Sequence, residues 1–263
     1  MSAPARWTDL RPRLISAAVL IAVALVAVWM GGIVWRILIA LSCAVMVWEL
    51  VNMVDTARSR SAPILGGLAG ACVLAAIHLP ASFALPLLLI PSMAGFGRME
   101  RGGVTYAVFT ALILLAGYGF MALRQDFGLV WMLWLVCVVV VTDVGGYFAG
   151  RTLGGPKLWP RVSPKKTWSG AVAGWIGAAL VGMIFAGATH VGSGLIGISI
   201  AISMASQIGD IAESTVKRKA GVKDSSSLLP GHGGLLDRFD GMLGAALFLL
   251  VAGQIVNFPP GVQ

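Results

Sequence analysis

The sequence predicts an all-α, polytopic integral membrane protein with about nine transmembrane helices and catalytic loops on the cytoplasmic side. Of its 263 residues, 58% are hydrophobic and only 11% are charged. An average soluble domain is about a quarter charged, so this chain has too little polar surface to cover a globule of its size. The mean hydropathy is +0.89. The apolar runs are continuous rather than alternating with a period of two, which excludes the lipid-facing strands of a barrel.

Nine apolar runs approach the length of about 20 residues that a helix needs to cross about 30 Å of hydrocarbon. The third and fourth runs are short and meet at Leu79-Pro80-Ala81, so they are candidates for a helical hairpin that does not fully cross. In chain order the runs are Leu14–Met30, Ile33–Val54, Ile64–Leu79, Ala81–Phe96, Val104–Leu123, Leu129–Gly146, Ala171–Ala188, Gly194–Gly209 and Met242–Phe258.

Hydropathy alone does not define the ends of two of these runs. The first run follows Arg11 and Arg13, as the apolar part of a signal peptide would. Its length, and the lack of a small-x-small cleavage pattern after it, favour an uncleaved first helix. The segment from Ile208 to Lys219 contains no proline and a single glycine. The eighth helix is therefore expected to continue beyond the bilayer.

The positions of lysine and arginine predict the orientation. With a cytoplasmic N-terminus and nine alternating spans, 17 of the 19 lysines and arginines fall on the cytoplasmic side, and only Arg36 and Arg124 fall outside. This sorting beside anionic lipid explains the net charge of +8. No nucleic-acid-binding motif is present, so no nucleic-acid partner is expected. The compact chain and its sidedness predict a bacterial inner-membrane protein.

Polar residues divide the chain into two parts by chemistry. The first five spans are chemically quiet, with Glu49 near the cytoplasmic end of the second span. From Asp143 onward, two cytoplasmic segments hold nearly all of the remaining charge. We therefore expect residues 1–142 to form a scaffold of membrane helices and residues 143–263 to carry the catalytic site.

The first polar segment is Gly150–Gly170, preceded by Asp143 at the end of a strongly apolar run. A carboxylate at membrane depth is costly and is by default a candidate functional residue. Glycines and clustered cations next to a helix start suit a polyphosphate, although no Walker A motif occurs. A basic loop that only faces anionic headgroups is the alternative. The candidate substrate-binding residues here are Ser163, Lys165, Lys166 and Thr167.

The second polar segment is Asp210–Asp240. Asp210, Glu213, Ser214 and Lys217 recur at helical spacing and form one stripe of a helix. Carboxylate oxygens are the ligands that Mg²⁺ prefers, and Asp210 can share one ion with a carboxylate from the end of the segment if the loop between them folds back as a hairpin. The alternative is a solvated helix followed by an aspartate that caps the last span. That alternative does not account for five cations and five carboxylates in 31 residues.

The stretch from Ser214 to Asp240 resembles the signature of phosphatidate cytidylyltransferases (CDP-diacylglycerol synthases). The signature has the form S-x-x-K-R-x4-K-D-x-S/G/A-x2-L-P-x-H-G-G-x-x-D-R-x-D, and its fixed positions are matched over 27 residues. Similarity extends upstream through Gly209–Ser214, Ser163–Thr167 and Asp143–Gly150. Family members commonly have K-T-x-E-G where this chain has Ser169 in place of the glutamate. Any role of that glutamate in orienting lysines or a metal is therefore in doubt here.

The resemblance implies transfer of a cytidylyl group from CTP to phosphatidic acid at the surface of the lipid bilayer, with pyrophosphate as the second product. It implies metal ligation, with Mg²⁺ as the expected ion, by Asp210 and Asp237, and more weakly by Asp240 and Asp143. The number of ions, the participation of a monovalent cation and a homodimeric state are left open. Site residues implied by the signature are Ser214, Lys217, Arg218, Lys223, Asp224, His232 and Arg238.

Two other functions are compatible with parts of the pattern. A secondary transporter would use Asp143 and Asp210 as ion-coupling carboxylates, but it predicts repeated span patterns and polar residues near mid-span. In this sequence the charged residues instead gather on the predicted cytoplasmic side of the membrane. A membrane kinase, or a transferase acting on another lipid phosphate, would need similar residues and stays an alternative.

Overall fold

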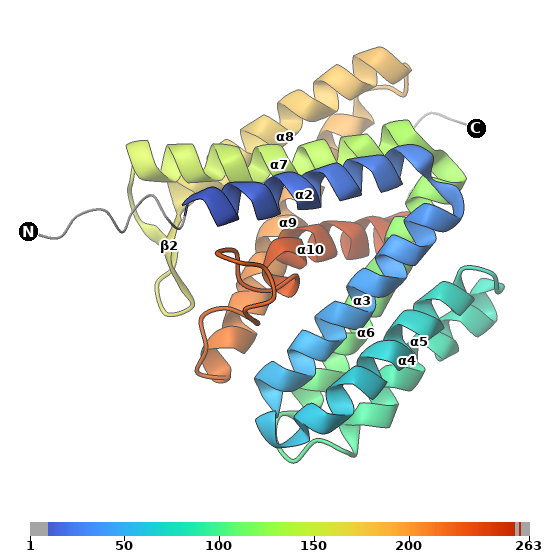
Figure 1. Cartoon of the computed structure of the whole chain (residues 1–263). Helices are drawn as coiled ribbons and strands as arrows, with labels where there is room; N and C mark the ends of the chain where they lie inside the picture. The colour runs from blue at the N-terminus through green and yellow to red at the C-terminus, as the bar shows by residue number, and fades with distance from the viewer. Residues whose placement is uncertain (1–9, 256–257, 259–263) are drawn as a thin grey trace, which may run out of the picture. The chain divides into compact units, whose positions relative to one another are not determined.

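The computed structural model describes residues 10–255 and 258, and these residues are mainly helical (Figure 1). Each of the nine predicted apolar runs overlaps an α-helix, and the last run extends beyond the end of its helix at Ala252. Two short helical turns, η1 (Thr56–Ser61) and η2 (Leu123–Phe127), lie between them. The α-helices are α2 (Leu10–Met30), α3 (Gly32–Val54), α4 (Ala62–Ala76), α5 (Ala81–Phe96), α6 (Gly103–Ala122), α7 (Leu129–Thr152), α8 (Trp168–Thr189), α9 (Gly194–Lys219) and α10 (Leu236–Ala252).

Within the described residues, five helical stretches are long and apolar enough to cross a membrane, which makes this a multi-pass membrane protein. They are α3, α6 continued through η2, α7, α8 and α9. The stretch Leu14–Met30 of α2, together with α4 and α5, forms shorter apolar helices. The count of nine spans stays a prediction. Two parts of the sequence-based prediction lie outside the described residues. They are Arg6, one of the 17 lysines and arginines assigned to the cytoplasmic side, and residues 256–257 of the last predicted span.

The chain forms two compact units. One comprises Met1–Leu129 and Lys219–Phe239, and the other Val130–Arg218 and Asp240–Gln263. The boundaries fall at the ends of helices or within the first turn of α10. The expected division at residue 143 is based on where the charged residues lie, whereas these two units are defined by packing. That division therefore stays a prediction.

In the first unit, α3, α4, α5 and α6 pack side by side (Figure 1). Helices α4 and α5 form the predicted hairpin around Pro80, which precedes the first residue of α5. Small residues allow the close packing: a Cβ on Gly70 would lie 2.8 Å from the carbonyl oxygen of Ala40. Tyr106 of α6 is fully buried, and its hydroxyl donates to the carbonyl oxygen of Pro91 in α5 at 2.9 Å. Such small residues and interhelical hydrogen bonds are the usual means of packing helices in a membrane.

In the second unit, glycines bring neighbouring helices close together. Gly146 of α7 lies against Gly170 of α8, where a Cβ on Gly146 would be 3.2 Å from the carbonyl oxygen of Gly170. Gly209 of α9 packs against α10 in the same way, because a Cβ on Gly209 would lie 3.0 Å from the Cα of Gly244. Helix α9 is confirmed as a 26-residue helix that continues to Lys219.

The segment predicted as a loop between α7 and α8 forms a two-stranded antiparallel hairpin, which corrects the sequence-based expectation. Strand β1 (Lys157–Trp159) pairs with β2 (Ser163–Thr167). The strands have three and five residues, and Pro164 lies within β2. Such short strands with a proline give no alternating pattern that would distinguish them from a loop.

Candidate active site

A cavity of about 590 Å³ lies within the second unit, between the end of α7, the β-hairpin, the start of α8 and α9. Its size is within the range of small-molecule sites, about 300–1,000 Å³. Five of the predicted site residues line it: Asp143, Lys165, Lys166, Thr167 and Asp210. Ser163 begins β2 but is not among the residues lining this cavity.

Sequence reasoning missed several side chains in this cavity. Arg151 and Lys157 add two cations to the lining, and they stood in the basic segment without being chosen. Tyr147 lies one turn after Asp143 and accepts a hydrogen bond from Arg151 at 2.7 Å. Gln207 precedes Asp210 by three residues on α9, so helical spacing alone could have identified it. The lining is therefore richer in cations than in carboxylates.

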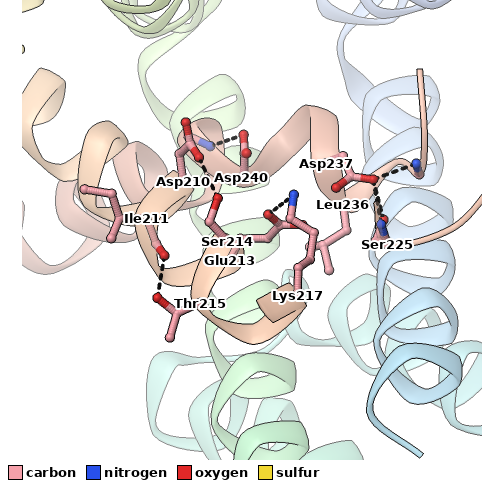
Figure 2. Close-up of polar contacts among 12 residues, drawn as sticks. Asp210, Ile211, Glu213, Ser214, Thr215, Lys217, Ser225, Leu236, Asp237 and Asp240 are labelled. Carbon is pink, nitrogen blue, oxygen red and sulfur yellow. Dashed lines mark hydrogen bonds and ion pairs between the residues drawn. The ribbon is translucent and has the colours of Figure 1, made fainter. Parts of the chain in front are cut away.

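Asp210 connects the β-hairpin to α9. Its carboxylate forms an ion pair with Lys166 of β2. It also accepts a hydrogen bond from the Ser214 hydroxyl at 3.3 Å (Figure 2). The predicted stripe on α9 is confirmed, because Ser214 lies one turn beyond Asp210 and the two side chains meet. The structure thus brings Lys166, Asp210 and Ser214 together at one point on the cavity.

The same stripe of α9 contains a second ion pair, between Glu213 and Lys217 (Figure 2). Both side chains are buried in the structure. Sequence reasoning assigned Lys217 to the site without its partner, although the spacing of four residues is the ordinary one for an ion pair on a helix. Glu213 therefore orients the side chain of Lys217, the first lysine of the signature.

Asp240 lies two residues before the apolar run that starts at Met242, and it belongs to the same unit as Asp210 and Asp143. Burial, followed by repulsion from Asp210 and, more weakly, from Asp143, raises the pKa of the Asp240 carboxyl to about 7. Its Oδ1 accepts a hydrogen bond from the backbone N–H of Gly241 at 2.7 Å. Asp210 and Asp143 are therefore close enough to destabilise the charged form of Asp240, which is the situation that a bound cation relieves.

Ser169, at the position where the family resemblance implies a glutamate, has a defined structural role. Its hydroxyl donates to the carbonyl oxygen of Gly154, in the turn before β1, and lies 3.0 Å from the hydroxyl of Thr167. Thr167 in turn is the N-cap of α8 and accepts from the N–H of Gly170 at 3.2 Å. Ser169 therefore links the first turn of α8 to both ends of the hairpin, through Gly154 before β1 and Thr167 at the end of β2.

The glycine-rich part of the signature, in the first unit, forms a tight turn. The N–H of Leu229 donates to the carbonyl oxygen of Gly233 at 2.8 Å, and the N–H of His232 donates back to Leu229 at 2.9 Å. Gly231 and Gly233 have φ angles of 75° and 82°, which L side chains rarely adopt. The ring Nδ1 of His232 lies 2.9 Å from the hydroxyl of Ser16 in α2.

Asp237 closes this loop at the start of α10. Its Oδ2 accepts hydrogen bonds from the N–H of Ser225 at 2.8 Å, from the Ser225 hydroxyl at 2.9 Å and from the N–H of Gly234 at 2.8 Å (Figure 2). The last bond is a cap of the kind that the alternative interpretation expected of this aspartate. Asp210 belongs to the other unit, so a metal shared by Asp210 and Asp237 stays a prediction.

Glu49 of α3 also binds this loop, so the description of the first five spans as chemically quiet was wrong. Its carboxylate is fully buried, at 0% exposure. It accepts hydrogen bonds from the backbone N–H groups of Leu235 and Leu236, each at 2.8 Å, and from the Ser226 hydroxyl at 2.7 Å. More than 170 residues separate Glu49 from these donors, so no local pattern in the sequence could reveal the contact.

The remaining signature residues lie on exposed surface. The structure places the side chains of Arg218, Lys223, Asp224 and Arg238 there, Arg218 at the end of α9 and the others in the loop or the first turn of α10. Their assignment to the site stays a prediction.

Comparison with known proteins agrees with the signature. The model of the cytidylyltransferase family matches residues 11–256. The chain belongs to this cytidylyltransferase family. It is 38% identical to the phosphatidate cytidylyltransferase of Brucella suis, with 96% of each chain covered. It is 31% identical to the phosphatidate cytidylyltransferase of Bacillus subtilis, over 92% of this chain and 96% of the relative. The match therefore includes the spans, the cavity and the signature loop together.

Proposed function

We propose that this chain transfers a cytidylyl group from CTP to phosphatidate, giving CDP-diacylglycerol and pyrophosphate. The observation that carries the proposal is the cavity in which Lys165, Lys166, Arg151 and Lys157 gather beside Asp210, in a member of the cytidylyltransferase family. Four cations around one space suit a polyphosphate, because each phosphate oxygen gains a charge-assisted hydrogen bond there. The relatives named phosphatidate cytidylyltransferase support phosphatidate as the acceptor.

In this reaction, an oxygen of the lipid phosphate attacks the α-phosphorus of CTP. The bond between that phosphorus and the oxygen that bridges to the β-phosphate breaks, and the electron pair leaves with pyrophosphate. The attacking oxygen is already anionic, so the chain does not need a strongly perturbed general base. Its task is to hold two polyanions together and to stabilise charge on the leaving group. Lys165 and Lys166 are assigned to the phosphates of CTP on this ground.

We assign Mg²⁺ to the carboxylates beside this cavity, Asp210, Asp240 and Asp143. When bound, the ion would neutralise charge on the phosphates. The support is the proximity of these carboxylates: burial first, and then repulsion from Asp210 and Asp143, raises the pKa of Asp240. Among the described residues no group of three or more metal-ligating side chains is already gathered. Mg²⁺ usually binds one or two carboxylates and completes its shell with substrate phosphates and water, so one or two of these aspartates would be enough to hold the ion. Asp237 is assigned as a further ligand from its place in the signature.

We further propose that the site faces the cytoplasm in a bacterial inner membrane, with nine spans and a cytoplasmic N-terminus. The support is the sorting of 17 of the 19 lysines and arginines to one side. In this arrangement phosphatidate remains in the leaflet while CTP arrives from water.

The direct test uses purified protein in detergent with radiolabelled CTP, phosphatidate and Mg²⁺, followed by thin-layer chromatography. Labelled CDP-lipid that depends on phosphatidate supports the proposal. Label on polyprenyl phosphate but not on phosphatidate would assign a different acceptor, and no labelled lipid with either acceptor would refute transferase activity. A Lys165→Met/Lys166→Met variant serves as the inactive control, and Glu100→Gln, at an exposed carboxylate, serves as the active one.

A further inference from the structure

A buried carboxylate in an apolar helix needs a compensating environment, and the one around Glu49 is built from the signature loop. An ionised carboxylate without partners would be strongly destabilising in such surroundings. Both oxygens of Glu49 instead accept hydrogen bonds: Oε1 from the N–H of Leu235 and the hydroxyl of Ser226, and Oε2 from the N–H of Leu236. All of these donors lie between residues 226 and 236.

The contact is directed at the N-terminus of α10. Leu236 is the first residue of that helix, and the first N–H groups of a helix have no partner within it. A carboxylate at this position satisfies them and is also favoured by the helix dipole. Glu49 therefore fixes the point at which the loop ends and α10 begins.

The same contact reaches Asp237 through the backbone and through Ser225. Asp237 is the residue after Leu236, and its Oδ2 accepts from Ser225 and Gly234. The hydroxyl of Ser225 lies 2.9 Å from Asp237 and 3.4 Å from Oε2 of Glu49, so it stands between the two carboxylates. Gly234 leaves no room between them, since a Cβ there would be 2.5 Å from Oε1 of Glu49.

We propose that Glu49 is a positioning residue, which holds the loop 225–236 and thereby sets the orientation of the Asp237 carboxylate. The consequence for turnover depends on the proposed cytidylyl transfer. A displacement of a reacting group by about 1 Å typically costs about 100-fold in rate. Loss of Glu49 therefore lowers kcat more than it changes the KM for CTP, because the cations that we assign to CTP lie in the cavity of the other unit.

The test compares Glu49→Gln, Glu49→Asp and Glu100→Gln, all as full-length protein in detergent. Glutamine keeps the size of the side chain but turns an NH₂ group toward a backbone N–H, donor against donor. Hydrogen–deuterium exchange of peptides within 225–237 is expected to be at least about tenfold faster in Glu49→Gln, because charge-assisted hydrogen bonds are lost. Peptides of α4 and α5 are expected to exchange as in the wild type. Glu49→Asp should be intermediate, and Glu100→Gln should match the wild type.

The exchange and kinetic results together decide the proposal. Faster exchange in the loop with kcat lower by about 100-fold and KM for CTP within about twofold supports it. Unchanged exchange overturns it, and so does faster exchange with unchanged kcat. If Glu49→Gln does not fold, Glu49→Asp and Ser226→Ala carry the same comparison. If the wild type transfers no cytidylyl group, the proposed function fails, while the exchange data still decide whether Glu49 holds the loop.

Discussion

The side chain of Lys166, on β2, forms an ion pair with Asp210, on α9, and both residues line the cavity of the second unit. The pair matters because its members have different assigned partners during the reaction. A phosphate of CTP would compete with Asp210 for the lysine, and a cation would compete with the lysine for Asp210. The two binding events are therefore expected to help each other by separating the ion pair.

Lys166→Met and Asp210→Asn should each lower kcat/KM for CTP by about 100-fold, since the first removes a cation that faces the phosphates and the second removes a proposed ligand of the metal ion. Because the residues are in contact, the double variant should lose less than the product of the single losses. The measurement is a double-mutant cycle on initial rates of CDP-lipid formation. Strictly multiplicative losses would show that the ion pair does not couple the two sites.

Removal of divalent cations should abolish turnover. After treatment with EDTA, activity is expected to return on titration with Mg²⁺, because charge on the leaving pyrophosphate then has a counter-ion. Asp240→Asn should increase the Mg²⁺ concentration needed for half-maximal rate, while Glu100→Gln should not. Full activity in the presence of EDTA would exclude the metal assignment as a whole.

Asp237→Asn should abolish cytidylyl transfer while the protein stays folded. Asparagine keeps the shape of the side chain and one oxygen acceptor, so part of the cap on Gly234 and Ser225 survives. The loss of charge at the start of α10 is expected to cost about 1 kcal/mol of stability. Size-exclusion chromatography and a thermal melt check the fold, and the assay with radiolabelled CTP checks turnover. Wild-type turnover by this variant at saturating Mg²⁺ would contradict its role as a ligand.

The sequence predicted the helices well because membrane spans are long and continuous in hydropathy. The stripe on α9 could be predicted equally well, since Asp210 and Ser214 are one helical turn apart and their side chains meet as expected. The β-hairpin was missed because its strands are too short to show a period. Glu49 was missed for a different reason: its contacts with Leu235 and Leu236 join distant parts of the chain, and only tertiary packing brings them together.

Gly234→Ala should damage the signature loop, whereas the same substitution at an uncrowded helical glycine of the first unit should not. A Cβ at position 234 would collide with the side chains of Ser225 and Glu49, both of which are buried and hydrogen-bonded. Overpacking of a well-packed site typically costs about 1–3 kcal/mol.

The matched control is Gly67→Ala, because a Cβ on Gly67 of α4 would meet nothing within 4 Å. Alanine is also favoured over glycine within a helix by about 1 kcal/mol, so this control should be neutral or stabilising. Thermal melts of both variants in the same detergent, with exchange measured over 225–237, provide the comparison. Equal melting temperatures and equal exchange would mean that the loop has room to move away from Glu49, which the contacts on both carboxylates argue against.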